Sequence, residues 1–225
     1  MNRTAGARAP QSVRARAPDT AKRILDAAER LAQSRGYNGF SYADIAARVG
    51  ISKASLHHHF QTKATLGRAL IERYRRQFMR ALTAIDAQGL DAADKLRSYA
   101  RLYAAVLEGD RLCLCGMLAA EYDTLPAPMQ QGIRQFFDAN EEWLAAILEQ
   151  GRSDGQFHRR GSARENAQLL LSALEGAMLV ARPYQDVARF NVASEQLLAG
   201  LQAPKLAAAR APLPRLQRRR RRRAS

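Results

Sequence analysis

The sequence predicts an all-α protein of about nine helices, with a compact three-helix unit at the front and a larger helical domain behind it. Apolar residues recur at helical spacing along most of the chain, and no segment shows the sustained period-two alternation of a half-buried strand. Alanine and leucine far outnumber valine and isoleucine, which favours helices. The 225 residues are 47% hydrophobic, so the chain can bury a sizeable core.

The first two helices are predicted from their boundary residues. An apolar stripe begins after Asp19 or Thr20 and stops at Gly36. The run Ser41-Tyr42-Ala43-Asp44 is a capping-box pattern, with Asp in place of the usual Glu, and it opens a second, short helix. Gly50 ends this helix, because the turn that follows needs a residue that tolerates positive φ.

Two further caps complete the front unit. Ser52 precedes a short helix that runs from Lys53 to about His59. Thr62 precedes a long helix, whose apolar residues continue at steps of three and four as far as Ile85. A short helix, a glycine turn and a capped second helix form a helix-turn-helix, in which the second helix enters the DNA major groove. The sequence therefore predicts this motif over about residues 42–61.

The larger domain contains the remaining helices, which are predicted over residues 91–108, 112–122, 126–150, 162–181 and 186–201. The segment 151–161 is expected to be a loop. The last two helices are apolar around much of their circumference, as helices buried on several sides are. We therefore expect a two-fold dimer whose interface is a four-helix bundle. Its predicted interface residues are Leu170, Leu174, Met178, Phe190, Leu197 and Leu198.

Positive charge is concentrated in the front unit and at both ends of the chain. The formal net charge is +15. Residues 19–80 hold 12 basic and 5 acidic side chains, whereas residues 81–203 hold 11 basic and 16 acidic ones. A polyanion partner is therefore expected at the front unit and not at the larger domain.

The two chain ends are predicted to be disordered: a basic arm over residues 1–18 and an arginine-rich tail over residues 204–225. The six consecutive arginines 218–223 would add nonspecific, salt-sensitive affinity for DNA. An RNA-binding tail, a tether to an anionic membrane and an inert extension are the alternatives.

One set of residues carries a family resemblance: Ile24-Leu25-Asp26-Ala27-Ala28, Leu31, Gly36-Tyr37, Ser41-Tyr42-Ala43-Asp44-Ile45-Ala46, Val49-Gly50-Ile51-Ser52-Lys53, Leu56-His57-His58-His59-Phe60, Lys63 and Leu66. With this set, residues 19–79 resemble the DNA-binding domain of TetR/AcrR-type regulators. The resemblance implies a homodimeric repressor that binds a palindromic operator. Residues 80–203 would then form a ligand-binding and dimerisation domain, in which a small molecule, or an electrophile or redox signal, releases the DNA.

Lys53 and Ser55 lie in the first turn of the predicted recognition helix and are the best candidates for reading bases, although Lys53 could contact only a phosphate. The adjacent histidines cannot converge on one metal ion, because neighbouring helical side chains point ~100° apart. His57 and His58 are therefore expected to face the groove or its phosphates. His57 stands where the family often has a phosphate-contacting tyrosine. The remaining DNA-binding candidates are Ser41, Tyr42, Ser52 and Lys63.

The larger domain has the composition of a helical bundle with a ligand pocket, although plain core packing is the alternative for each residue. Cys113 and Cys115 lie ~200° apart on a helix and make a poor chelating pair. They are either buried apolar residues or a redox or electrophile sensor, which Arg111 and a helix start would favour by lowering a thiol pKa. The candidate pocket residues are Tyr99, Tyr103, Cys113, Cys115, Met117, Tyr122, Phe137, Trp143 and Met178.

Other function classes find little support. A G-x-S-x-G match at residues 151–155 lacks the strand that a hydrolase needs before it. The longest apolar run, residues 169–181, is too short to span a bilayer, and the N-terminus lacks the apolar segment of a signal peptide. We therefore expect a cytoplasmic bacterial protein, nucleoid-associated when bound, that is not an enzyme and has no cofactor, metal or membrane partner. The alternative is a basic nucleic-acid-binding protein of low specificity.

Overall fold

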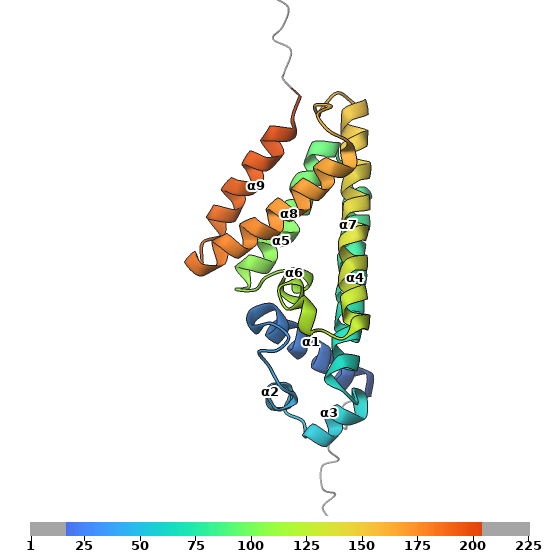
Figure 1. Cartoon of the computed structure of the whole chain (residues 1–225), viewed down its shortest axis with the longest axis vertical. Coiled ribbons are helices and arrows are strands. Elements are labelled where there is room, and N and C mark those ends of the chain that lie inside the picture. Colours follow the sequence, from blue (N-terminus) through green and yellow to red (C-terminus); the bar gives the residue numbers. More distant parts are fainter. Residues whose placement is uncertain (1–16, 204–225) are drawn as a thin grey trace, which may run out of the picture.

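The computed structural model describes residues 17–203, which form nine α-helices connected by short turns (Figure 1). Within these residues there is no β-strand, and the one β-type pairing is an isolated bridge between Phe157 and Gln202. The predicted all-α class is confirmed. The predicted arm and tail lie outside the described residues, except that the first helix takes in residues 17 and 18.

The front unit contains α1 (Ala17–Arg35), α2 (Tyr42–Val49), α3 (Lys53–His59) and the first turns of α4 (Lys63–Asp86). Figure 1 shows α2 and α3 at one end of an elongated molecule, with α8 and α9 toward the other end. The larger domain contains α5 (Ala92–Glu108), α6 (Leu114–Ala119), the 3-10 turn η1 (Tyr122–Thr124), α7 (Ala127–Ser153), α8 (Ala163–Ala181), the 3-10 turn η2 (Arg182–Tyr184) and α9 (Val187–Leu201).

The predicted caps set the helix boundaries of the front unit. The Ser41 side chain accepts a hydrogen bond from the N–H of Asp44, and the Asp44 carboxylate accepts one from the N–H of Ser41. Ser52 and Thr62 cap α3 and α4 in the same way, each accepting from the N–H three residues later. Gly50 ends α2 in the left-handed region, at φ 71°, where a residue with a Cβ would be strained.

Helix α4 joins the two units. Its predicted apolar stripe is buried throughout: Leu66, Leu70, Tyr74, Phe78, Leu82 and Ile85. The helix packs on α1 in the front unit and on α5, α6 and α7 in the larger domain. A displacement of α4 in the larger domain would therefore reach the front unit directly.

Several helix boundaries differ from the prediction: α1 begins at Ala17, before Asp19, and α6 ends at Ala119 instead of near Tyr122. Helix α6 also begins two residues late, at Leu114, and before it the N–H of Leu112 donates to the carbonyl of Gln33 in α1. Helix α7 continues to Ser153, beyond the expected stop at Gly151. Gly151 lies inside the helix and allows close packing, since a Cβ there would collide with the ring of Phe157. The left-handed turn comes four residues later, at Gly155, with φ 73°.

Candidate functional site

Helix α3 is attached by one face and leaves the other face exposed. Leu56 is fully buried and anchors the helix on the core that contains Ile45 and Val49 of α2. Lys53, His57 and His58 lie on the exposed side, while Ser55 is half-buried, and its N–H donates to the Ser52 hydroxyl. The structure thus leaves three of the predicted DNA-binding side chains exposed on this helix, of which Lys53 and His57, four residues apart, share one face.

His57 is oriented by a hydrogen bond at one ring nitrogen. Its Nδ1 lies 3.1 Å from the carbonyl oxygen of Gln61. A carbonyl oxygen only accepts, so Nδ1 must carry a proton and donate. In the neutral ring Nε2 then has only a lone pair, and it becomes a donor when the ring is protonated. A contact from Nε2 to a DNA phosphate therefore requires the imidazolium.

A hollow of about 310 Å³ brings His57 together with Ser41, Tyr42 and Lys63, and Phe40 completes its lining. The Tyr42 ring lies 4.8 Å from the His57 ring, and the Tyr42 hydroxyl donates to the carbonyl of Phe60 at 2.8 Å. Burial, with a smaller contribution from Tyr37, raises the pKa of Tyr42 to about 12. The Ser41 hydroxyl donates to Asp44. Four of the predicted DNA-binding residues, from three separate segments, thus meet at one surface hollow.

Lys63 has a structural role that the sequence did not predict. Its ammonium donates to the carbonyls of Tyr37 at 2.6 Å and Phe40 at 2.5 Å, and it lies over both rings, 4.4 and 4.5 Å from their centroids. Burial lowers the pKa of Lys63. Two of its three protons are used inside the protein, which ties α4 to the segment after α1. A phosphate contact by Lys63 stays a prediction.

Glu121 links the front unit to the larger domain. Its carboxylate accepts from the N–H of Tyr37 at 2.7 Å and from the N–H of Asn38 at 3.2 Å. The Asn38 amide also donates to the Thr124 hydroxyl at 2.9 Å. Gly36, with φ 78°, leaves space for this carboxylate, because a Cβ there would overlap it. The segment after α1 is therefore held from both sides, by Lys63 and by Glu121.

Arg182 makes a second link, at the end of α1. Its guanidinium donates to the carbonyls of Gln33 at 3.1 Å and Ser34 at 2.9 Å. Arg111 donates to the side-chain oxygen of Gln33 at 2.9 Å. The carbonyl groups at a helix C-terminus carry partial negative charge, so two guanidinium groups stabilise this end of α1. Sequence reasoning missed both links, because nothing local distinguishes Glu121 or Arg182 from a solvated charge.

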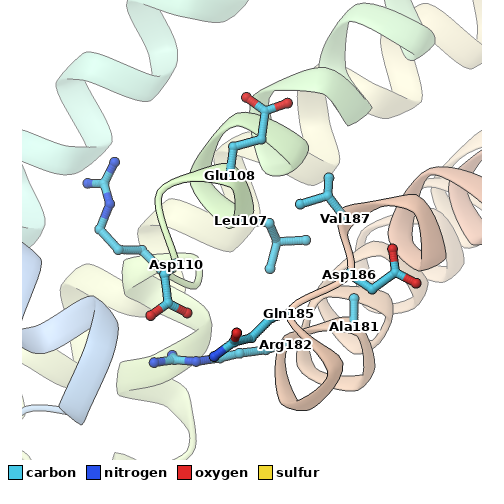
Figure 2. A pocket seen from close by; sticks show the side chains of 9 residues that line it. Leu107, Glu108, Asp110, Ala181, Arg182, Gln185, Asp186 and Val187 are labelled. Atoms are coloured by element: carbon cyan, nitrogen blue, oxygen red, sulfur yellow. The ribbon is translucent and has the colours of Figure 1, made fainter.

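A pocket of about 270 Å³ lies beside the Arg182 link, between the end of α5 and the connection from α8 to α9. Figure 2 shows Arg182 extending from this connection toward α1, with the Asp110 carboxylate close above it. Asp110 and Gln185 line the pocket, and both have positive φ, at 52° and 50°. None of the pocket residues predicted from the sequence lines it.

The predicted pocket residues form a packed aromatic cluster around Phe78 of α4. The Phe78 ring lies 5.9 Å from each of the rings of Tyr99 and Tyr103, with Phe136 at 5.2 Å. The Tyr99 and Tyr103 hydroxyls are 3.0 Å apart, and Trp143 stacks on Tyr99. These predicted residues do come together.

The remaining predicted pocket residues lie around this cluster or apart from it. Met178 is fully buried, whereas Met117 and Phe137 are half-buried. Tyr122 lies in the η1 turn and is hydrogen-bonded by Arg134.

Of the two alternatives for the cysteines, burial is confirmed for both, and the low thiol pKa that a sensor would need is not found. Cys113 and Cys115 are buried, and burial, followed by the neighbouring Glu175 carboxylate, raises the pKa of each thiol well above its ordinary value. Arg111 donates to Gln33 instead of approaching a thiol. The Tyr74 hydroxyl lies 3.7 Å from the Cys113 sulfur. Of the two features that motivated a sensor cysteine, the helix start is present, since Cys113 directly precedes α6, but its effect on the thiol pKa is outweighed by burial and Glu175, and Arg111 is bound elsewhere.

Glu175 is a functional candidate that the sequence analysis missed. Its Oε1 atom is buried and has no hydrogen-bond partner, and among residues 17–203 it is the one carboxylate oxygen in that condition. The residue as a whole is partly exposed, but burial of the carboxyl raises its pKa to about 7, against a smaller opposing effect of a hydrogen bond from Cys113. The available signal was a single acidic residue inside the apolar run 169–181.

Five of the six predicted dimer residues are buried within their own chain and are not free to form an interface, whereas Leu197 stays a prediction. Leu170, Leu174, Met178, Phe190 and Leu198 are buried in the core of their own chain, and Leu197 is half-buried. The exposed apolar residues lie on the opposite side of α8 and α9: Leu169, Leu179, Val180 and Val192, each more than half exposed. Because α8 and α9 are apolar on several faces, the sequence alone does not indicate which face packs on the core of the same chain and which face stays exposed.

Two family profiles match the chain. The one described as "Bacterial regulatory proteins, tetR family" matches residues 24–70, and the one described as "Tetracyclin repressor-like, C-terminal domain" matches residues 92–197. Together they span both units of the fold.

Solved structures and curated relatives agree. A TetR-family transcriptional regulator from Agrobacterium tumefaciens is 34% identical, with a TM-score of 0.80, over 83% of this chain and 99% of that one. A TetR transcriptional regulator from Legionella pneumophila is 31% identical, with a TM-score of 0.74, over 80% of this chain and 96% of that one. The transcriptional repressor NemR of Escherichia coli (strain K12) is 24% identical over 173 residues, 73% of this chain and 84% of the relative.

An exposed recognition helix on a helix-turn-helix, joined by one long helix to a helical bundle, defines a DNA-binding transcriptional regulator. The chain belongs to the TetR family. This family consists of regulatory DNA-binding proteins and not of enzymes. Within residues 17–203 no helix is long and apolar enough to cross a membrane, and no three acidic, histidine or cysteine side chains are grouped as metal ligands.

Proposed function

We propose that the protein is a homodimeric repressor that binds a palindromic operator and releases it when a small molecule binds in its C-terminal domain. The observation that carries this proposal is the exposed face of α3, with Lys53, His57 and His58, on a unit anchored by Leu56. Such a helix places its first side chains at base edges and its neighbours at phosphates. Operator binding implies the nucleoid-associated, cytoplasmic location expected from the sequence.

Dimerisation is supported by the exposed apolar side of α8 and α9. Leu169 is 61% exposed, Val180 63% and Val192 61%. Gly176 lies on the same side of α8, where a Cβ would meet nothing within 4 Å. An apolar strip of this kind is covered in a two-fold interface, and small residues let helices approach closely. Dimerisation would place two α3 helices on successive major grooves.

Release of DNA is attributed to α4 and the two links from the larger domain. Tyr74 and Phe78 place α4 against the aromatic cluster, and Lys63 holds its first turn to the front unit. A ligand that binds better to one separation of the two front units than to another would shift the dimer toward that separation. The buried, high-pKa thiols favour a reversible ligand over thiolate chemistry as the signal.

Binding-site selection from fragmented genomic DNA tests the proposal. We expect the bound fragments to share a two-fold symmetric sequence. We also expect the Lys53→Ala variant to lose its base preference at one position of each half-site. The loss should be about 1–3 kcal/mol of discrimination between the right and the wrong base at that position. Glu142→Gln, an exposed change on α7, is the matched control. The second candidate function, low-specificity nucleic-acid binding, is favoured by the arginine-rich residues 204–225, and it predicts no shared sequence among the fragments.

A further inference from the structure

The Glu175 carboxylate lies in the interior of the bundle without an opposite charge. Its Oε1 atom is buried and has no hydrogen-bond partner, and the Cys113 thiol, a weak donor, is the side chain that hydrogen-bonds the carboxyl group. Its Oε2 atom lies against Gly116 in α6, in space that a Cβ at that position would occupy. A buried carboxylate oxygen with no partner is unfavourable, so its presence calls for a physical explanation.

The titratable groups around the carboxylate include no lysine, arginine or histidine. They are Tyr74 of α4, Tyr99 and Tyr103 of α5, and the thiols of Cys113 and Cys115 beside and within α6. All five are neutral near pH 7, because burial raises the pKa of each of them. The described residues therefore place three phenol groups and two thiols within electrostatic reach of this carboxylate, but no cation.

Rings and a buried carboxylate together are the groups that recognise an organic cation. Aromatic faces attract a cation through their quadrupole, and a carboxylate accepts charge-assisted N–H bonds that are stronger than neutral ones. A neutral effector would leave Oε1 unpaired if the carboxyl ionised, and an anionic effector would be repelled. The surroundings of Glu175 thus select for positive charge.

This inference rests on the proposed function: we propose that Glu175 recognises the effector, and that the effector is an organic cation with N–H donors, such as an amine or an amidine, on an aromatic or apolar body. The body would contact Tyr74, Tyr99 and Tyr103. Because Tyr74 belongs to α4, a ligand inserted between it and Glu175 would displace the helix whose first turn holds the front unit.

Benzamidine, a cation at neutral pH, and benzamide, its neutral analogue of similar shape, test the charge requirement. We expect calorimetry at pH 7 to show binding of benzamidine to the full chain at least about tenfold tighter than binding of benzamide. We also expect a proton to be released on binding, so that the apparent enthalpy depends on the ionisation enthalpy of the buffer. Glu175→Gln should abolish the tenfold preference and the proton release, whereas Glu142→Gln should preserve both.

Three outcomes overturn the proposal: no binding of benzamidine, equal binding of both probes, or unchanged binding by Glu175→Gln. A second variant, Gly116→Ala, checks the geometry, since its Cβ would displace the carboxylate and weaken benzamidine binding. Operator affinity of both variants, measured without probe, separates the two hypotheses. If Glu175→Gln binds the selected operator normally but the probes fail, only the cation proposal is wrong. If no protein prefers an operator, the proposed repressor function is wrong.

Discussion

The substitution Glu175→Gln should stabilise the protein above neutral pH, because it replaces a buried carboxyl by a neutral group of the same shape. Burial raises the pKa of this carboxyl from its ordinary value of 4.5 to about 7. At about 1.36 kcal/mol per pKa unit, the wild-type protein loses up to about 3 kcal/mol of unfolding free energy to this one group at pH 8. The amide of glutamine would avoid that loss.

The direction of the pH effect follows from which state holds the proton. Below pH 4.5 the carboxyl is protonated in both the folded and the unfolded chain, so it costs nothing. Between pH 4.5 and about 7 the unfolded chain has lost the proton and the folded chain retains it, so the unfolding free energy falls as the pH rises. Above about pH 7 the difference is constant. The variant and the wild type should therefore be nearly equal in stability at pH 4.5 and diverge up to pH 7.

Urea unfolding measures this difference directly. Trp143 is the one tryptophan of the chain and stacks on Tyr99, so its fluorescence reports the packing of the bundle. The titrations should be run at a fixed protomer concentration, because dimerisation makes apparent stability concentration-dependent. The exposed control Glu142→Gln should show no such pH trend. A Glu175→Gln variant that is less stable than wild type at pH 8, or whose difference from wild type is the same at pH 5 and pH 8, would refute the reasoning.

Three further predictions concern the two ends of the molecule. If His57 contacts a phosphate through Nε2, His57→Ala should weaken operator affinity measured by fluorescence anisotropy, and His57→Tyr should weaken it less. Equal affinities of the three proteins would exclude this contact. Val180→Glu should convert the dimer to a monomer in analytical ultracentrifugation at micromolar concentration, unlike the exposed Gln135→Glu on α7; a dimer in both would exclude this face. Arg182→Ala should lower the free energy of unfolding by about 1–2 kcal/mol and speed amide hydrogen exchange over residues 33–38. Unchanged exchange would show that Arg182 does not hold the end of α1 in place.

Local signals in the sequence predicted the front unit well. The Ser41 capping box, the Gly50 stop and the caps at Ser52 and Thr62 are interactions among residues at most four apart, so their spacing is visible in the sequence. The α4 stripe was predicted for the same reason, since period 3.6 alone determines which side is buried.

Long-range features could not be predicted in this way. Glu121 and Arg182 contact residues 84 and 148 positions away, and no local pattern marks such pairs. The dimer residues were placed on the buried side because α8 and α9 are apolar on two sides, and periodicity does not tell a core from an interface. The high pKa of the cysteine thiols depends first on burial by the tertiary fold and then on Glu175, which lies 60 or more positions along the chain.

The central claim is that α3 reads a defined DNA sequence, and the ratio of operator to scrambled-DNA affinity tests it most directly. The ratio should be measured by competition at physiological salt, for the full chain and for a chain lacking residues 204–225. The account predicts a ratio of about 10³ or more for both proteins, with a shallower salt dependence for the shortened one. A ratio near one for the full chain, or a preference that disappears with residues 204–225, would contradict it.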